Sequence, residues 1–407
     1  MGTPGRNGSA RRRVSATPRW TTASPRARTR PRCSVSSHAG WPVPWWVCAL
    51  AAWCLVAALG VLRIEFNGRV LAVLTAAEIA VIAVLDVVYA AHPDAGRLSM
   101  GTLDPAGLLV PGAAAVLVTA VTGFVGFEQA TVYSEESKDP RRTTSRATYA
   151  TYALTAVLYA GTAWLISVAA GPRHVAALAA KEQVGLMFTL AAPHIPAVVL
   201  DVAGVLFATS LLAALISFHN AVARYTFALG RESVLPRSLA RTSRRWSSPK
   251  YASLLQSAVA LLVIAGYAVT GTDPLVKLFF WGGMAGGMGA LLLITTAAVA
   301  IPIYLGLNPR GESLPARLGW PVVAVVGLLA VTLAAAVNLH VLLGVPATSS
   351  LPSVLLAGYG LVAAVGVAWA LLLRRTRPSV YARIGLGPAA ATGDTDLEAA
   401  TYHGGTR

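Results

Sequence analysis

The sequence predicts an all-α membrane protein with about nine transmembrane helices. Of its 407 residues, 55% are hydrophobic and only 12% are charged, whereas soluble domains carry about 25% charged residues. Long stretches contain no Asp, Glu, Lys or Arg, among them residues 202–223, 251–272 and 278–309. A bilayer core needs about 20 apolar residues in a helix to cross it. A chain in hydrocarbon must also satisfy its backbone hydrogen bonds internally, so these stretches are predicted to be helices.

The first 40 residues differ from everything that follows. They carry nine arginines, many Ser, Thr and Pro residues and no acidic residue, a composition that favours disorder and is similar to that of a transit peptide. We therefore expect three regions: a disordered Arg-rich segment (1–40), a transmembrane domain (41–377) and a cytoplasmic tail (378–407).

The nine predicted spans follow one another with short connections. They cover residues 44–62, 67–91, 107–130, 147–170, 196–227, 251–270, 276–305, 319–344 and 353–373.

Basic residues alternate between the connecting loops and predict the orientation. Arg and Lys collect in the loops after the odd-numbered spans, whereas the other loops carry only Arg97, Arg173, Lys181 and Lys277. The positive-inside rule therefore places the odd-numbered loops and the C-terminus in the cytoplasm of a cell-membrane protein. Nine spans would leave residues 1–40 outside, so we expect either that an odd number of upstream spans is missing or that this segment is not a natural start.

The net charge of +16 does not indicate a nucleic-acid-binding protein. The cations lie in the first segment and in loops between apolar runs, which is a membrane pattern rather than a basic face. Cys33, Cys48 and Cys54 form neither a disulfide framework nor a zinc motif.

The third span contains the strongest chemical signal. Gly123 and Gly126 flank aromatic residues, and Glu128 follows inside the span. Glycine weakens a helix interior by about 1 kcal/mol relative to Ala, and a carboxylate within the membrane is costly and commonly functional. A helix broken here would expose backbone dipoles able to hold a small zwitterion. The alternative is that the glycines allow close helix packing and that Glu128 caps a helix or extends to the interface.

Two segments resemble the amino acid–polyamine–organocation permeases. Gly126–Gln129, Tyr133–Thr143 and Arg146–Tyr149 resemble the sixth helix of that family and the loop after it. Asn220–Leu239 resembles the end of the eighth helix and its following loop. The resemblance covers roughly residues 44–385 and aligns the nine spans with family helices four to twelve.

The resemblance implies a fold and a site. The fold would be part of a leucine-transporter-like bundle of two inverted five-helix repeats, lacking the first three helices. The substrate would lie at the break, with the backbone of Thr122, Val125, Gly126 and Phe127 facing its ammonium group and Glu128 nearby.

Three further residues are candidates. Phe218 matches a position that lines the substrate side chain in relatives, with simple packing as the alternative. Trp281 is a candidate gate or an interfacial anchor. Glu78 lies mid-span, in a region where proton-coupled relatives carry a lysine, and a buried Glu can exchange a proton near neutrality. Its alternative role is a structural hydrogen bond to a neighbouring helix.

Two other ionisable residues receive structural interpretations. Asp86 lies near the end of its span, where a carboxylate can extend to the interface. His219 is expected to be packed and hydrogen-bonded rather than to act as a ligand.

Secondary active transport is the function that these patterns predict. The substrate would be an amino acid or organic amine, moved by symport or exchange, with a proton as a candidate coupling ion. No metalloprotease, P-loop or nucleophile-elbow motif occurs in the sequence, so an enzyme and a bound cofactor are not expected. The competing hypothesis is a remnant of such a permease that inserts into the membrane without transporting.

Overall fold

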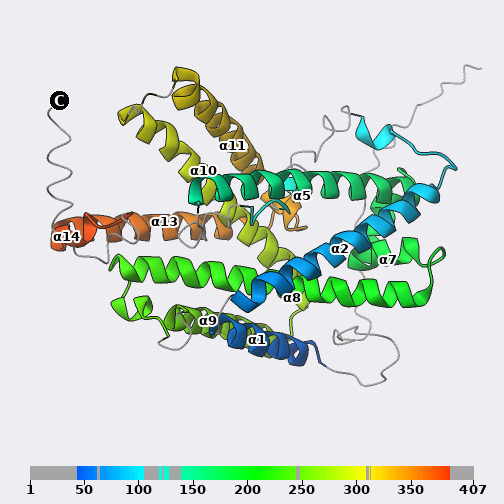
Figure 1. The fold of residues 1–407 in the computed structure, drawn as a ribbon, viewed down its shortest axis with the longest axis horizontal. Helices are drawn as coiled ribbons and strands as arrows, with labels where there is room; N and C mark the ends of the chain where they lie inside the picture. Colours follow the sequence, from blue (N-terminus) through cyan, green and yellow to red (C-terminus); the bar gives the residue numbers. More distant parts are fainter. Residues whose placement is uncertain are drawn as a thin grey trace, which may run out of the picture.

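In the computed structural model, the regular elements of the described residues are all helical (Figure 1). The structure describes residues 44–61, 65–104, 119–121, 123–127, 139–243, 248–308, 311 and 313–385.

The described helices of the N-terminal half cover the first five predicted spans except the third. They are α1 (Trp45–Val61), α2 (Glu65–Ala91), the 3₁₀ turn η1 (Gly101–Leu103), α5 (Pro140–Ala170), α6 (Val175–Glu182), η4 (Gln183–Gly185), α7 (Leu186–Ala191) and α8 (Ala197–Arg231).

The C-terminal half contains the remaining spans. Its elements are η5 (Arg237–Ala240), α9 (Lys250–Thr270), the π-helical turn η6 (Pro274–Trp281), α10 (Gly282–Leu307), the π-helical turn η7 (Pro315–Gly319), α11 (Trp320–Val337), α12 (Leu339–Leu342), α13 (Leu351–Thr376) and α14 (Pro378–Tyr381).

Seven described helical stretches are long and apolar enough to cross a membrane, which confirms a multi-pass all-α protein. They are Ala72–Ala91, Arg142–Ala170, Ala197–Arg231, Lys250–Thr270, Pro274–Leu307, Pro315–Val337 and Leu351–Thr376. The first predicted span is the shorter apolar helix α1, 17 residues long. The third predicted span is described only at residues 119–121 and 123–127.

Local signals explain where two of these elements start. The side chain of Asp139 accepts a hydrogen bond from the backbone N–H of Arg142 at 3.3 Å, and Pro140 occupies the first turn of α5. Asp273 accepts from Leu275 at 2.8 Å at the start of η6, again just before a proline. Both are N-caps of the usual kind. The Asp139 cap starts α5 seven residues before the predicted boundary at residue 147.

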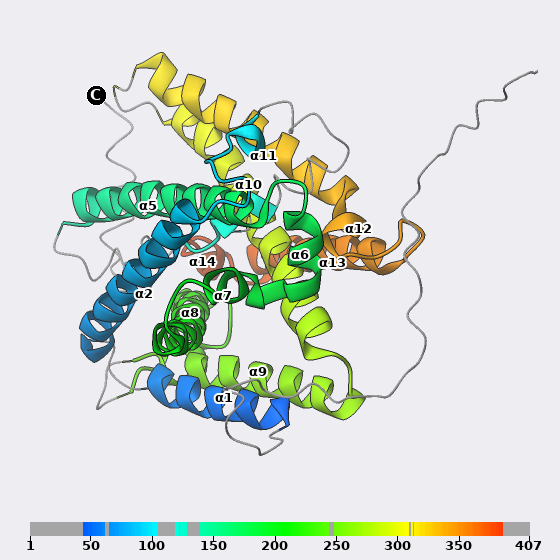
Figure 2. The same ribbon diagram turned by 90° about the vertical axis from the view of Figure 1, so that its right-hand side faces the viewer.

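The helices pack in two groups (Figures 1 and 2). On one side α1 lies beside α9 and against α8, while α2 contacts α5, α7 and α8. On the other side α10 packs along α11. Each group has its own buried apolar cluster: Leu85, Tyr89 and Ala191 in the first, and Met288, Leu291 and Ala335 in the second.

Candidate functional site

The third span turns where the glycines predicted a break. The N–H of Phe124 donates to the carbonyl of Val121 at 3.0 Å, and that of Phe127 donates to the carbonyl of Phe124 at 3.3 Å. Both bonds connect residues three apart, whereas an α-helix connects residues four apart. Gly126 has φ +116°, a conformation open to glycine and rare for other residues. The chain therefore leaves the α-helical path at residues 124–127.

Aromatic residues from α5 hold this turn. The ring of Phe124 lies 4.9 Å from that of Tyr152 and 5.9 Å from that of Tyr159, and the ring of Phe127 lies 6.2 Å from that of Tyr152. Aromatic pairs at these separations stabilise each other beyond simple burial. A Cβ on Gly123 would lie 3.0 Å from the Tyr159 ring, so glycine permits this close approach.

The start of the turn is attached to the other group of helices. Val121 packs against the buried cluster of Met288, Leu291 and Ala335 on α10 and α11. The turn therefore lies between α5 on one side and the α10–α11 pair on the other.

Three of the predicted substrate residues lie in this turn because they are consecutive in the sequence. Val125, Gly126 and Phe127 share the turn, while Thr122 and Glu128 lie outside the described residues. Phe218 lies on α8 with 45% of its surface exposed. Its ring makes no aromatic contact within the described part of the chain.

Trp281 occupies the junction between η6 and α10. Its indole N–H donates to the carbonyl of Leu343 at 2.9 Å, and the ammonium group of Lys277 lies 5.6 Å from the centre of its ring. These contacts connect the start of α10 to the end of α12. The indole of Trp281 is therefore held by a hydrogen bond from its N–H and by a cation–π contact with Lys277.

Glu78 lies partly buried on α2. Its Oε1 atom is shielded from solvent and has no hydrogen-bond partner among the residues that the structure describes. An unpartnered carboxylate oxygen in a membrane span is unfavourable when charged.

His219 is packed and hydrogen-bonded, as expected. It is 6% exposed, and its Nε2 atom lies 2.8 Å from the hydroxyl of Ser253. Its contacts connect α8 to α9.

Two features of α2 were not predicted from the sequence. The first is a hydrogen bond from the hydroxyl of Thr162 on α5 to Oδ2 of Asp86 at 2.9 Å. Asp86 therefore contacts a neighbouring helix rather than only extending to the interface. The sequence offered one signal that Asp86 could face a neighbouring helix. Asp86 follows the mid-span Glu78 by eight residues, which is about two helical turns.

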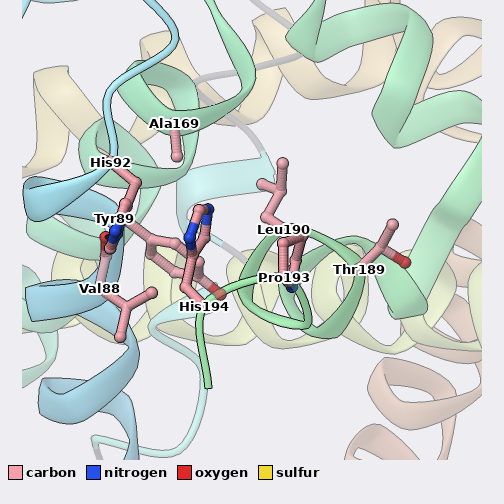
Figure 3. A pocket seen from close by; sticks show the side chains of 8 residues that line it. All are labelled: Val88, Tyr89, His92, Ala169, Thr189, Leu190, Pro193 and His194. Atoms are coloured by element: carbon pink, nitrogen blue, oxygen red, sulfur yellow. Dashed lines mark hydrogen bonds between the residues drawn. The ribbon is translucent and has the colours of Figure 1, made fainter. Parts of the chain in front are cut away.

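The second feature is a pocket at the end of α2 (Figure 3). It has a volume of about 210 Å³ and lies between α2, the end of α5 and the α7–α8 connection. Its lining residues are Val88, Tyr89, His92, Ala169, Thr189, Leu190, Pro193 and His194. The rings of His92 and His194 stack with their centres 3.6 Å apart. No sequence pattern places these two histidines together, because His92 follows α2 and His194 lies far along the chain in the α7–α8 connection.

One comparison with known proteins identifies the chain. The family model described as "Amino acid permease" matches residues 32–364, which is most of the chain. No curated protein and no solved structure matches it. The matched range contains both the broken third span and the Asn220–Leu239 segment. The chain therefore belongs to the amino acid permease family of the amino acid–polyamine–organocation superfamily.

Proposed function

We propose that this protein is a secondary transporter that carries an amino acid or a related organic amine across the plasma membrane. Membership of the amino acid permease family supports amino acid transport as the general activity. The turn at residues 124–127 is the observation that carries the proposed mechanism. An interrupted helix at membrane depth offers backbone dipoles to a charged ligand where water is scarce.

The substrate would bind with its ammonium group toward the backbone of the turn. Val125, Gly126 and Phe127 supply that backbone, with Thr122 and Glu128 as neighbours in sequence. Tyr152 and Tyr159 hold the turn from α5 through its aromatic residues. Phe218 would contact the substrate side chain, and Trp281 would act as a gate.

A proton gradient is the proposed energy source, with Glu78 as the coupling residue. Protonation removes the cost of a charged carboxylate in the membrane. Binding of a proton and of a substrate could then favour the same state of the bundle, which is what coupling requires. The C-terminus is proposed to lie in the cytoplasm.

Uptake into liposomes tests the proposal directly. We expect liposomes containing the purified chain to accumulate radiolabelled amino acids, tested singly, with saturable kinetics and competition by excess unlabelled substrate. Protein-free liposomes are the control. Uptake no greater than in that control for every amino acid and organic amine tested would contradict the proposal and support the non-transporting alternative.

A further inference from the structure

We propose that Asp86 is a second proton-binding residue of this transporter, open to the outer solution through the pocket at the end of α2. The role in transport rests on the proposed function. Proton binding at Asp86 is a separate property of the carboxyl group and can be measured without transport.

The two oxygens of Asp86 have different surroundings. Oδ2 accepts the hydrogen bond from Thr162 at 2.9 Å. Oδ1 is shielded from solvent and has no partner among the described residues. A charged carboxylate with one oxygen desolvated and unpartnered is unfavourable. A proton on Oδ1 would remove the charge and leave the bond from Thr162 unchanged.

No cation within the neighbouring spans faces Asp86. The part of α5 between Arg146 and Arg173 contains no Lys or Arg, and α8 contains none before Arg224. Lys181 and Glu182, at the end of α6, form an ion pair with each other at 3.1 Å. Among the described residues, no Lys or Arg forms a salt bridge with Asp86 to stabilise its charged form.

Other titratable side chains lie on α2 and on the helices that pack against it. On α2 they are Glu78, two turns earlier, and Tyr89 and His92, one and two turns later. α5 carries Tyr159, three residues before Thr162, α8 carries Asp201, and α7 carries no titratable residue. The hydroxyl of Tyr89 donates to the carbonyl of Met187 at 2.6 Å, so it is engaged elsewhere.

The pocket is the proposed path from the solution to Asp86. Tyr89 is three residues after Asp86, so the two lie on neighbouring positions of one helix face, and Tyr89 lines the pocket. His92 and His194, at the same pocket, are exposed. Its volume of about 210 Å³ can hold several water molecules. By the charge asymmetry of the loops this end of α2 is the outer one.

Infrared difference spectra recorded between acid and alkaline pH test the proton site. We expect reconstituted wild-type protein to show a protonated-carboxyl carbonyl band that Asp86→Asn loses. Asp201→Asn is the matched control, because Asp201 is exposed on α8, and it should keep the band. Thr162→Val preserves the carboxyl group but removes its donor, so it should shift the band. Equal bands in wild type and Asp86→Asn would overturn the proposal.

Transport assays distinguish a role of Asp86 in proton coupling from the proposed role of Glu78. We expect an inward proton gradient to stimulate wild-type uptake and not uptake by Asp86→Asn, while substrate exchange without a gradient persists in the variant. Glu78→Gln should lose the same stimulation. If Asp86→Asn still responds to the gradient and Glu78→Gln does not, Asp86 has no role in coupling. Absence of any wild-type uptake would contradict only the transport function, since the infrared band tests proton binding independently.

Filling the pocket tests the access route. Ala169 lines the pocket, and Ala169→Leu adds bulk there without changing any charge. We expect the variant to keep the carboxyl band but to slow its shift on transfer to D₂O several-fold. An unchanged rate of exchange would show that protons reach Asp86 by another route.

Discussion

At the scale of single residues, Gly60 lies where α1 packs closely against α8 and α9. A Cβ at this position would fall on Nε2 of His219 and within 2.8 Å of the hydroxyl of Ser253. These two side chains are hydrogen-bonded and buried between α8 and α9. α1 can therefore approach them only because it has glycine at this point.

Replacement of Gly60 by Ala should destabilise the protein. Forcing an extra carbon into a packed site costs about 1–3 kcal/mol, which exceeds the gain of up to about 1 kcal/mol in helix propensity. We expect a lower apparent Tm in detergent for Gly60→Ala than for wild type. Gly266→Ala on α9 is the control, because nothing lies within 4 Å of its new Cβ. A Tm for Gly60→Ala equal to that of the control would refute the close contact.

Residue-level contacts were the least predictable part of the molecule. Glu78 was selected from the sequence because a carboxylate in the middle of a span is rare. That selection does not depend on knowing which residue lies beside Glu78. Asp86 was predicted to extend to the membrane–water interface because the sequence showed that it lies near the end of its span. The sequence did not show that Thr162 on α5 lies beside it. Which residue faces Asp86 depends on how α5 rotates against α2, and hydropathy carries no information about that rotation.

At the scale of elements, the third span shows which local signals carry structural information. Two glycines three residues apart predicted an interruption, and the described residues turn at 124–127 with φ +116° at Gly126. The prediction succeeded because backbone preference is a local property. The tyrosines of α5 that hold this turn were not predicted, since their contact joins residues far apart in sequence.

Gly126→Ala should disable transport more than it disturbs folding. A residue with a Cβ at this φ costs about 1–3 kcal/mol, so the turn would shift toward ordinary helix and withdraw its backbone from the substrate. We expect the initial uptake rate to fall at least tenfold while the amount of monodisperse protein stays close to wild type. Gly204→Ala on α8 has no atoms within 4 Å of the new Cβ and should transport normally. Normal uptake by Gly126→Ala would remove the turn from the mechanism.

At the scale of the whole molecule, the outer surface of the bundle is that of a protein in lipid. In the most apolar window of each of the seven long spans, at most 17% of the residues are buried. Large apolar side chains such as Leu262, Leu293 and Val362 are more than 70% exposed. An apolar surface this extensive requires a membrane or a partner. Hydropathy predicted the fold class because the bilayer fixes both the length and the hydrogen bonding of each span.

Orientation in the membrane is the prediction that concerns the molecule as a whole. Thr242 lies in the Arg-rich connection before α9, and Ser350 lies just before α13; both are exposed. Between them lie three helices long and apolar enough to cross a membrane, α9, α10 and α11, so we expect the two positions to face opposite sides. Six cations lie at residues 231–250 and none lies at residues 338–353. Because basic loops tend to stay in the cytoplasm, we predict that Thr242 lies inside and Ser350 outside.

Cysteine labelling in intact cells tests this orientation. In a background with Cys33, Cys48 and Cys54 replaced by Ser, Ser350→Cys should react with a membrane-impermeant maleimide added outside. Thr242→Cys should react only after the membrane is permeabilised, which also controls for its reactivity. The opposite pattern would invert the topology and move the pocket at the end of α2 to the cytoplasmic side. Equal labelling of both positions from outside would contradict the three intervening crossings themselves, because an odd number of spans cannot return the chain to the same face.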